Sequence, residues 1–225
     1  MWCVPKVNKE FVDKMEDVLS VYERPYNSRE PVVCLDERPV QLRDCARAST
    51  HGKPGKIAKQ DYEYVRRGTA NVFCGIEPLK GRHFTRATPN RTAPQFAEYL
   101  RAVARSYPGA KTIHAVVDNL NTHCLKSLTR WFGPRRGAAL WNRFTFHFTP
   151  KHGSWLNQAE IEISVMSRQC LSGRRIPDLR CLRRETSAWD RRANRDELRI
   201  RWGFSRRDAR KTFRNKLHEF TRSED

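Results

Sequence analysis

Two short apolar runs in this chain each end on an aspartate, and this repeated pattern limits the folds that the sequence can adopt. The first run covers residues 31–36 (PVVCLD) and the second covers residues 112–118 (TIHAVVD). A continuous apolar run of this length is typical of a strand that is buried on both faces of a sheet. In open α/β sheets the reactive groups gather beyond the carboxyl ends of parallel strands. We therefore expect Asp36 and Asp118 to lie side by side at one edge of a central sheet.

The first half of the chain predicts one helix followed by three strands. Apolar residues at spacings of four, four and three residues predict an amphipathic helix within residues 1–30 that ends before Pro25. Further strands are predicted at 69–76 and 82–88, and the stretch 49–59, with its glycines, proline and lysines, reads as a loop. The predicted helix is marked by Phe11, Met15, Leu19 and Tyr22.

The second half alternates helices and strands. A helix begins at Thr92, with Phe96, Leu100, Val103 and Ala104 on its buried face, and a short helix is expected over residues 121–132. A loop at 133–137 (GPRRG) and an alternating strand at 143–148 follow. The last core helix opens at Gly153 and Ser154, and its buried face is marked by Leu156, Ile163, Met166 and Cys170. This order of elements predicts an α/β fold with a mixed sheet.

A third acid is needed if Asp36 and Asp118 bind metal for phosphodiester chemistry. Two Mg²⁺ ions about 4 Å apart, which clamp the attacking and leaving oxygens, need a further oxygen ligand besides two carboxylates. Glu160 is the candidate, because the helix pattern puts it at the border of the buried face. Glu162, two residues later, should point the opposite way into solvent. Taken singly, a strand-terminal Asp also commonly caps a turn, and a Glu in a first helical turn also suits the helix dipole.

The charge of the chain identifies its class of partner. The 225 residues contain 44 Lys and Arg against 25 Asp and Glu, a formal net charge of +19, and 32 of the basic residues are arginine. Arginine grips phosphate oxygens with a planar fork, so this balance favours a nucleic-acid-binding protein. The alternative is an ordinary solvated basic surface.

Several other classes of site and location are not supported. No apolar run approaches the ~20 residues of a membrane span, and no secretory signal is visible, so we expect a cytoplasmic, nucleoid-associated protein with reduced thiols. No Cys/His set has zinc-ligand spacing, and we interpret His51, His83, His147 and His152 as ordinary polar residues. The stretch 51–56 (HGKPGK) lacks the phosphate-loop pattern and reads as a flexible basic loop.

Four blocks of the sequence resemble a known family. They are residues 31–37 (PVVCLDE), 62–69 (YEYVRRGT), 116–123 (VVDNLNTH) and 148–160 (FTPKHGSWLNQAE). In this order they look like the blocks of a bacterial insertion-sequence transposase of the mariner-like group, a member of the DDE superfamily. The resemblance runs from about Trp2 to about Phe213.

The resemblance implies a fold and an activity. It implies an RNase H-like α/β fold, as in retroviral integrases, with a central five-stranded mixed sheet flanked by helices. It divides the chain into a connecting helix (1–30), a catalytic domain (31–172) and a basic helical tail (173–225). The implied activity is Mg²⁺-dependent cleavage and strand transfer of DNA in transposition, recombination and integration, with two Mg²⁺ ions per site and Mn²⁺ as a substitute.

The family's residues and partners carry over by position. The metal-binding triad falls on Asp36, Asp118 and Glu160, which are the expected catalytic residues. Asn119, His123, Trp155 and Asn157 match neighbouring positions and are expected to support the triad or the structure. The implied partners are double-stranded DNA, as transposon ends and target, and further copies of the chain in a homodimer or higher synaptic oligomer.

Two departures from the family pattern leave alternatives open. The spacing of 42 residues between Asp118 and Glu160 is longer than usual, and we place the extra residues in the loop at 133–139. Full-length relatives carry a helix-turn-helix DNA-binding region before the catalytic domain. The chain is therefore expected to be a truncated copy, the second frame of a split gene partnered by a separate helix-turn-helix polypeptide, or a sequence with a misplaced start. The rival functions are an RNase H-like structure-specific nuclease and a non-catalytic DNA-binding remnant.

Overall fold

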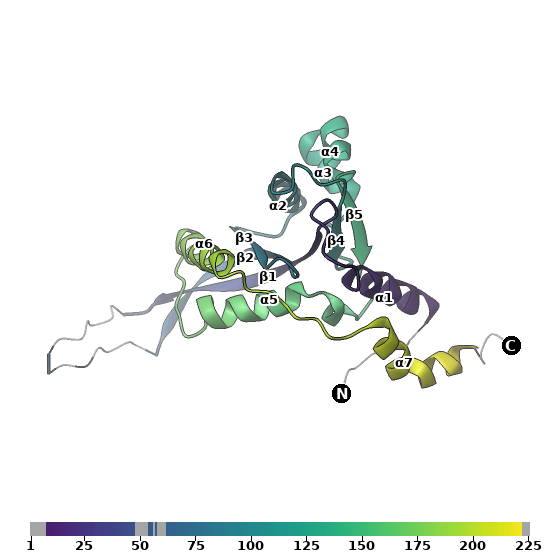
Figure 1. Cartoon of the computed structure of the whole chain (residues 1–225). Helices are drawn as coiled ribbons and strands as arrows, with labels where there is room; N and C mark the ends of the chain where they lie inside the picture. The colour runs from purple at the N-terminus through teal and green to yellow at the C-terminus, as the bar shows by residue number, and fades with distance from the viewer. Residues whose placement is uncertain (1–7, 48–53, 56, 58–61, 222–225) are drawn as a thin grey trace.

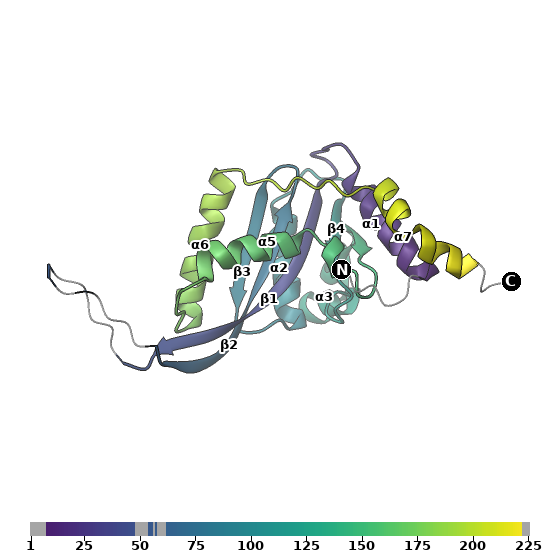
Figure 2. The same cartoon turned by 90° about the horizontal axis from the view of Figure 1, so that it is seen from below.

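A five-stranded sheet forms the centre of the molecule, with helices on both of its faces (Figures 1 and 2). The computed structural model describes residues 8–47, 54, 55, 57 and 62–221. The strands are β1 (Val32–Cys45), β2 (Tyr64–Glu77), β3 (Arg82–Thr88), β4 (Ile113–Val117) and β5 (Phe144–Phe148).

The strand order is β3-β2-β1-β4-β5. Strands β1 and β2, and β2 and β3, pair antiparallel, whereas β1 and β4, and β4 and β5, pair parallel. The sheet is therefore mixed and five-stranded, as expected. Its parallel half holds both of the apolar runs that end on aspartate.

The helices divide between the two faces. Helices α2 and α3 pack on one face, while α1, α5 and α6 pack on the other. The helices are α1 (Lys9–Tyr22), α2 (Ala93–Arg105), α3 (Leu125–Phe132), α4 (Pro134–Trp141), α5 (Ala159–Met166), α6 (Leu179–Arg195) and α7 (Arg206–Thr221), with a 3₁₀ turn η1 (Ser154–Leu156) and a π-helical turn η2 (Ser167–Leu171).

The predicted helical stripes are buried. Phe11, Met15 and Leu19 of α1 lie in the core beneath β1 and β4, and Phe96 and Leu100 of α2 lie in the core on the opposite face. A buried apolar side chain contributes about 1.5–3 kcal/mol relative to an exposed one, so these stripes hold the helices on the sheet. The same holds for the predicted face of the last core helix, whose members Leu156, Ile163, Met166 and Cys170 are all buried.

Strand β1 is longer than the apolar run predicts. It continues beyond Asp36 to Cys45 and pairs with β2 along this length, while its pairing with β4 covers only Val32–Cys34. The prediction was wrong about where the strand ends, because charged residues after Asp36 are compatible with an exposed antiparallel ribbon. This β1–β2 hairpin projects from the body of the molecule (Figures 1 and 2). The predicted loop at 49–59 lies largely outside the described residues.

The predicted loop at 133–139 is also wrong, because Pro134 opens helix α4. Proline is favoured in the first turn of a helix, where its missing N–H is not needed. Gly137 brings α4 against α3, since a Cβ at this position would lie 2.6 Å from the backbone of Leu128. The extra residues between Asp118 and Glu160 therefore build a packed helical pair, not a loose loop.

The carboxyl-terminal segment packs against the rest of the chain. Helix α6 buries Leu182 and Trp189 in the core beside β3, and α7 returns to α1, where the Phe213 and Phe11 rings lie 6.1 Å apart. The carboxyl-terminal segment is therefore helical, as expected, but α6 belongs to the core and is not an appendage to it. The division between a catalytic domain and a tail at residue 172 stays a prediction.

Candidate active site

Asp36 and Asp118 lie at the carboxyl ends of neighbouring parallel segments. Asp118 directly follows β4, and Asp36 lies two residues beyond the last residue of β1 that pairs with β4. The side chain of Asp36 accepts a hydrogen bond from the backbone N–H of Glu37 at 2.8 Å. The local pattern of an apolar run followed by an acid thus puts both carboxylates at one edge of the sheet.

Asp36 is a partly buried acid among other acids. Burial, together with the negative charges of Glu160, Glu37 and Asp118, raises its pKa to about 7 against the opposing hydrogen bond from the Glu37 N–H. Among the influences that dominate this pKa there is no cation. The site is therefore electrostatically prepared for a cation, because a bound positive charge would relieve both the repulsion and the burial cost.

Asn157 ties the beginning of α5 to the same place on β1. Its side-chain N–H₂ donates to the backbone carbonyl of Leu35 at 2.8 Å and to Asp36 Oδ2 at 3.4 Å, and its Oδ1 accepts from the Ala159 N–H at 3.1 Å. Glu160 follows in the first turn of α5, with an exposed side chain whose charge acts on Asp36. Asn157 itself is fully buried.

Asp118 is held by the loop that follows it. Its Oδ1 accepts from the Leu120 N–H at 3.1 Å and lies 2.9 Å from His123 Nδ1. Burial would raise the pKa of Asp118, but the hydrogen bond and charge of His123 lower it below its usual value. Asp118 is therefore ionised under ordinary conditions.

His123 links Asp118 to Glu37, a residue that the sequence analysis did not single out. The Nε2 of His123 lies 3.0 Å from Glu37 Oε1, and both side chains are almost fully buried. Burial would lower the pKa of His123, but the hydrogen bonds to Asp118 and Glu37 raise it to about 10. The position of Glu37, on the opposite face of β1 from Asp36, is the sequence signal that could have found it.

Glu37, Asp118 and His123 also form a group whose ligand atoms all lie within 4.8 Å of one another. A metal ligand must be a neutral imidazole, whereas this histidine has both ring nitrogens bonded to carboxylates and a raised pKa. We interpret this group as an ion-paired support for Asp118. The side chain of Asp118 itself is 37% exposed.

Two other predicted supporting residues connect segments that are distant in the sequence. Asn119 donates to the backbone carbonyl of Thr149 at 2.6 Å and accepts from Lys14 Nζ at 3.4 Å, so it joins β5 and α1 to the loop after β4. Trp155 packs edge-on against Phe204, with ring centroids 5.5 Å apart.

Glu162 is buried, and the expectation that it is solvated was wrong. Its Oε1 lies 2.6 Å from His83 Nδ1, with side-chain exposures of 3% for Glu162 and 1% for His83. Burial raises the pKa of Glu162 against the opposing hydrogen bond from His83. Positions 159, 162, 163 and 166 form the buried face of α5, so Glu162 faces the core, whereas Glu160 is exposed at the border of that face.

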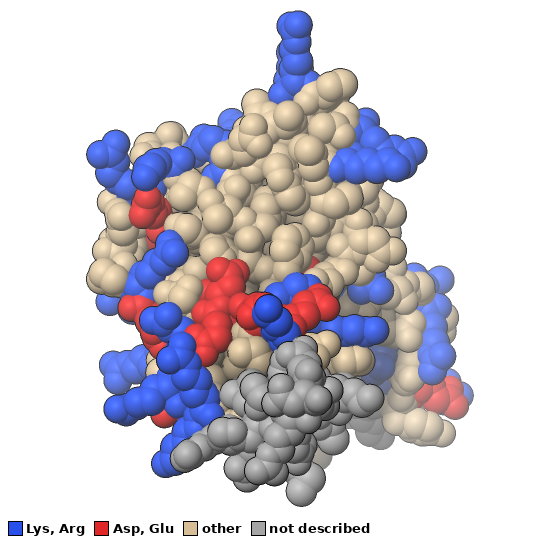
Figure 3. Space-filling model, turned by 90° about the vertical axis from the view of Figure 1, so that its right-hand side faces the viewer, with Lys and Arg blue, Asp and Glu red and all other residues tan. Residues whose placement is uncertain are grey.

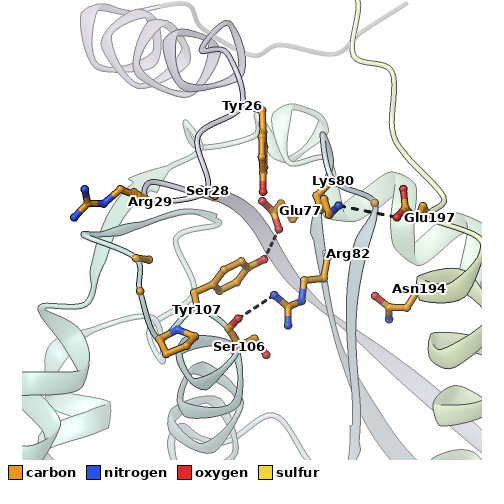
Figure 4. Close-up of a pocket in the computed structure, with 14 residues that line it drawn as sticks. Tyr26, Ser28, Arg29, Glu77, Lys80, Arg82, Ser106, Tyr107, Asn194 and Glu197 are labelled. Carbon is orange, nitrogen blue, oxygen red and sulfur yellow. Dashed lines mark hydrogen bonds and ion pairs between the residues drawn. The ribbon is translucent and has the colours of Figure 1, made fainter.

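A separate cavity of about 520 Å³ lies at the other edge of the sheet (Figure 4). There the Tyr107 hydroxyl donates to Glu77 Oε2 at 2.7 Å, and Arg82 donates to the Ser106 carbonyl at 2.9 Å. Basic residues, among them Arg29 and Lys80, also line this cavity. In the described part of the chain no metal-binding group of acids gathers here.

Acidic side chains gather on one face of this basic protein. Figure 3 shows one face on which Asp and Glu gather in a band, with Lys and Arg above and below it. Within the described residues, no helix is both long and apolar enough to cross a membrane.

Comparison with known proteins places this fold. A family model described as DDE superfamily endonuclease matches residues 31–183. The structure is similar to that of the Mos1 mariner paired end complex with Mn (TM-score 0.52, 15% identity, 88% of this chain and 61% of that chain). It is also similar to the Mos1 strand transfer complex (TM-score 0.54, 14% identity, 88% and 60%). No curated protein matches.

These similarities confirm the RNase H-like fold class. The chain spans about three fifths of the length of the Mos1 chains that it matches.

Proposed function

The chain belongs to the DDE superfamily of endonucleases, and from this premise we propose that it cleaves and transfers DNA strands with Asp36, Asp118 and Glu160 as its catalytic acids. The observation that carries the proposal is the position of the acids: Asp36 and Asp118 follow the paired parts of neighbouring parallel strands, and Asn157, just before the helix that bears Glu160, donates to Asp36. The pKa of Asp36, raised to about 7 by burial and by the neighbouring acids, agrees with this placement. Three acids, from β1, the end of β4 and α5, are thus close enough for the charges of Asp118 and Glu160 to act on Asp36.

The residues present fit divalent cations. Carboxylate oxygens are the ligands that Mg²⁺ and Mn²⁺ prefer. No cationic side chain is among the main influences on the pKa of Asp36. Asp36, Asp118 and Glu160 would hold two such ions. When bound, the ions supply activation of the attacking oxygen and stabilisation of the leaving 3′ oxygen. The similarity to a Mos1 complex with Mn supports this choice of metal.

The chain's own residues position the acids and bind the substrate. His123 orients Asp118, and Asn157 fixes the start of α5 against Asp36. Arginine and lysine side chains neutralise DNA phosphates, in keeping with the net charge of +19. The substrates proposed are transposon ends and target DNA, as in the Mos1 paired-end complex with left transposon end, with further copies of the chain in the assembly.

The test is Asp118→Asn on a duplex that carries an element end. Loss of Mg²⁺-dependent nicking is expected, with salt-sensitive DNA binding nearly intact. Asp196→Asn is the matched control, because Asp196 is exposed at the end of α6, and it should nick like the wild type. Unchanged nicking by Asp118→Asn would refute the assignment. Cleavage of RNA–DNA hybrids with none of element ends would favour the structure-specific nuclease.

A further inference from the structure

A groove of about 750 Å³ runs between the base of the β1–β2 hairpin and the turn that follows α5. Five arginines line it, and in the described part of the chain no acidic side chain does; they are Arg38, Arg43, Arg168, Arg174 and Arg175. Like charges gathered in one concave surface raise the local concentration of anions. The groove is therefore a site for an anionic ligand.

The guanidinium groups of the groove are held in place by neighbours. Arg174 is bonded to Glu185 at 2.7 Å from outside the groove, and the Arg43 guanidinium lies over the Tyr64 ring at 4.8 Å from its centroid. The Arg43 N–H also donates to the Ile176 carbonyl at 2.8 Å, which joins the two walls of the groove. Arginine that is oriented in advance loses less entropy when it binds phosphate.

The groove continues from the candidate active site along two elements. Arg38 lies two residues after Asp36 on β1, and side chains at i and i+2 of a strand share one face. Arg168 lies in η2, directly after α5, the helix that carries Glu160 in its first turn. The two elements that lead into the walls of the groove, β1 and α5, thus each carry one of the proposed acids. Figures 1 and 2 show α5 lying beside the hairpin.

The distance between the proposed acids and the arginines of the groove can be estimated from their spacing in the sequence. Glu160 and Arg168 are eight residues apart, about 12 Å along a helix, and Asp36 and Arg43 are seven residues apart, about 24 Å along a strand. One strand of B-DNA advances about 3.4 Å per nucleotide. The arginines therefore lie where phosphates about four to seven nucleotides from the scissile bond would pass.

We propose that this groove binds the phosphate backbone of duplex DNA on one side of the scissile phosphodiester, about four to seven nucleotides from it. The inference rests on the proposed function, because the acids define the position of the scissile bond. Arginine forks match phosphate oxygens bidentately, and a lining whose charged residues are all arginines suits contacts to the DNA backbone, which do not depend on the base sequence.

The test is the salt dependence of duplex binding by Arg43→Gln/Arg168→Gln, measured without divalent metal. Removal of two phosphate contacts should reduce the slope of log K against log salt by about 1.8. Arg105→Ala/Arg130→Ala is the matched control, since both of these arginines are exposed on the helices of the opposite sheet face. The control should keep the wild-type slope.

Neutral methylphosphonates then locate the contact. Substitution four to seven nucleotides to one side of the scissile bond should weaken binding by the wild type more than binding by the double variant, which keeps the other three arginines of the groove. An unchanged slope, or equal effects of methylphosphonates at every position, would overturn the proposal. An unchanged slope together with lost self-association would assign the groove to a second copy of the chain and would also overturn it.

The two proposals fail separately. The binding slope needs no catalysis, so it can be measured with Asp118→Asn as the starting protein. Persistent nicking by Asp118→Asn would refute the catalytic role of Asp118, but it would not affect the slope of log K against log salt. If the slope of log K against log salt is the same in Arg43→Gln/Arg168→Gln as in the wild type, the groove does not bind DNA. Nicking by the wild type would still support the proposed function.

Discussion

His123 Nδ1 lies 2.9 Å from Asp118 Oδ1, so the acid that ends β4 is bonded to a buried histidine five residues later in the same loop. The other ring nitrogen of His123 is bonded to Glu37 Oε1 at 3.0 Å. Strand β1 therefore supports the carboxylate of β4 through one imidazole, while it presents Asp36 on its other face. A histidine fixed from both sides restricts the orientation of Asp118, which is a common arrangement around metal ligands.

Replacement of His123 by Ala should weaken both folding and metal binding. Glu37 would be left as a buried carboxylate without its partner, which costs about 3–5 kcal/mol of unfolding free energy. Affinity for Mn²⁺ should fall about 10- to 100-fold, because Asp118 loses its support. Urea unfolding and Mn²⁺ titration by calorimetry measure the two effects. Wild-type Mn²⁺ affinity in a folded His123→Ala protein would contradict this role.

The stability that His123 contributes should decline at alkaline pH. Its pKa is raised from 6.5 to about 10 in the folded protein, so the folded state binds its proton more tightly than the unfolded state does. The contribution is fully present below pH 6.5 and is lost as the pH rises through about 10. The unfolding free energy of the wild type, minus that of His123→Gln, should shrink over this interval. A difference that stays constant from pH 6 to 10 would show that the imidazolium is not what stabilises the loop.

Binding of Mn²⁺ should release a proton from Asp36 below neutral pH. The pKa of Asp36 is raised to about 7, so below this pH a metal ion must displace the proton in order to bind. Affinity should therefore rise with pH up to about 7 and then level off. Calorimetry in buffers of different ionisation enthalpy counts the protons released at pH 6. Asp36→Asn should show none, and equal release by this variant would place the proton elsewhere.

The placement of the acids on the sheet was predictable because it depends on local patterns. An apolar run followed by Asp indicates a buried strand, and Asp118 directly follows β4 as this pattern predicts. Asp36 lies within the longer β1, two residues beyond the part of that strand that pairs with β4. The stripe containing Phe96 and Leu100 likewise predicted the buried face of α2. The connection of these elements into an RNase H-like fold came from the four resembling blocks, not from periodicity.

Features that depend on contacts between distant elements were missed. Glu162 was expected in solvent because it lies two residues after Glu160 and so points away from it, and only the presence of His83 on β3 makes the burial of Glu162 acceptable. Glu37 was not predicted as a site residue, because its partner His123 is 86 residues away in the sequence. Helix α4 was read as a loop because Gly137, which signals a turn in isolation, here permits close contact with α3.

Substitution of the two acids of α5 should have different effects, one on stability and the other on activity. Glu162→Ala leaves buried His83 without its carboxylate, so we expect a loss of about 3–5 kcal/mol in unfolding free energy. Glu160→Gln changes an exposed side chain, so its unfolding free energy should stay within about 0.5 kcal/mol of the wild type, while nicking is lost. Urea unfolding at pH 7 and a nicking assay give the two readouts.

A double variant gives the control for the buried pair. His83→Leu/Glu162→Met replaces both partners by apolar groups, and a fully removed buried pair is often nearly neutral. Most of the stability lost in Glu162→Ala should therefore return, and a double-mutant cycle with the single variants should show strong coupling. A loss below about 1 kcal/mol for Glu162→Ala, which is the range of an exposed ion pair, would show that His83 and Glu162 are not a buried pair. The orientation of α5 would then be wrong as well, because it is the burial of Glu162 against His83 that leaves Glu160 on the exposed side of the helix.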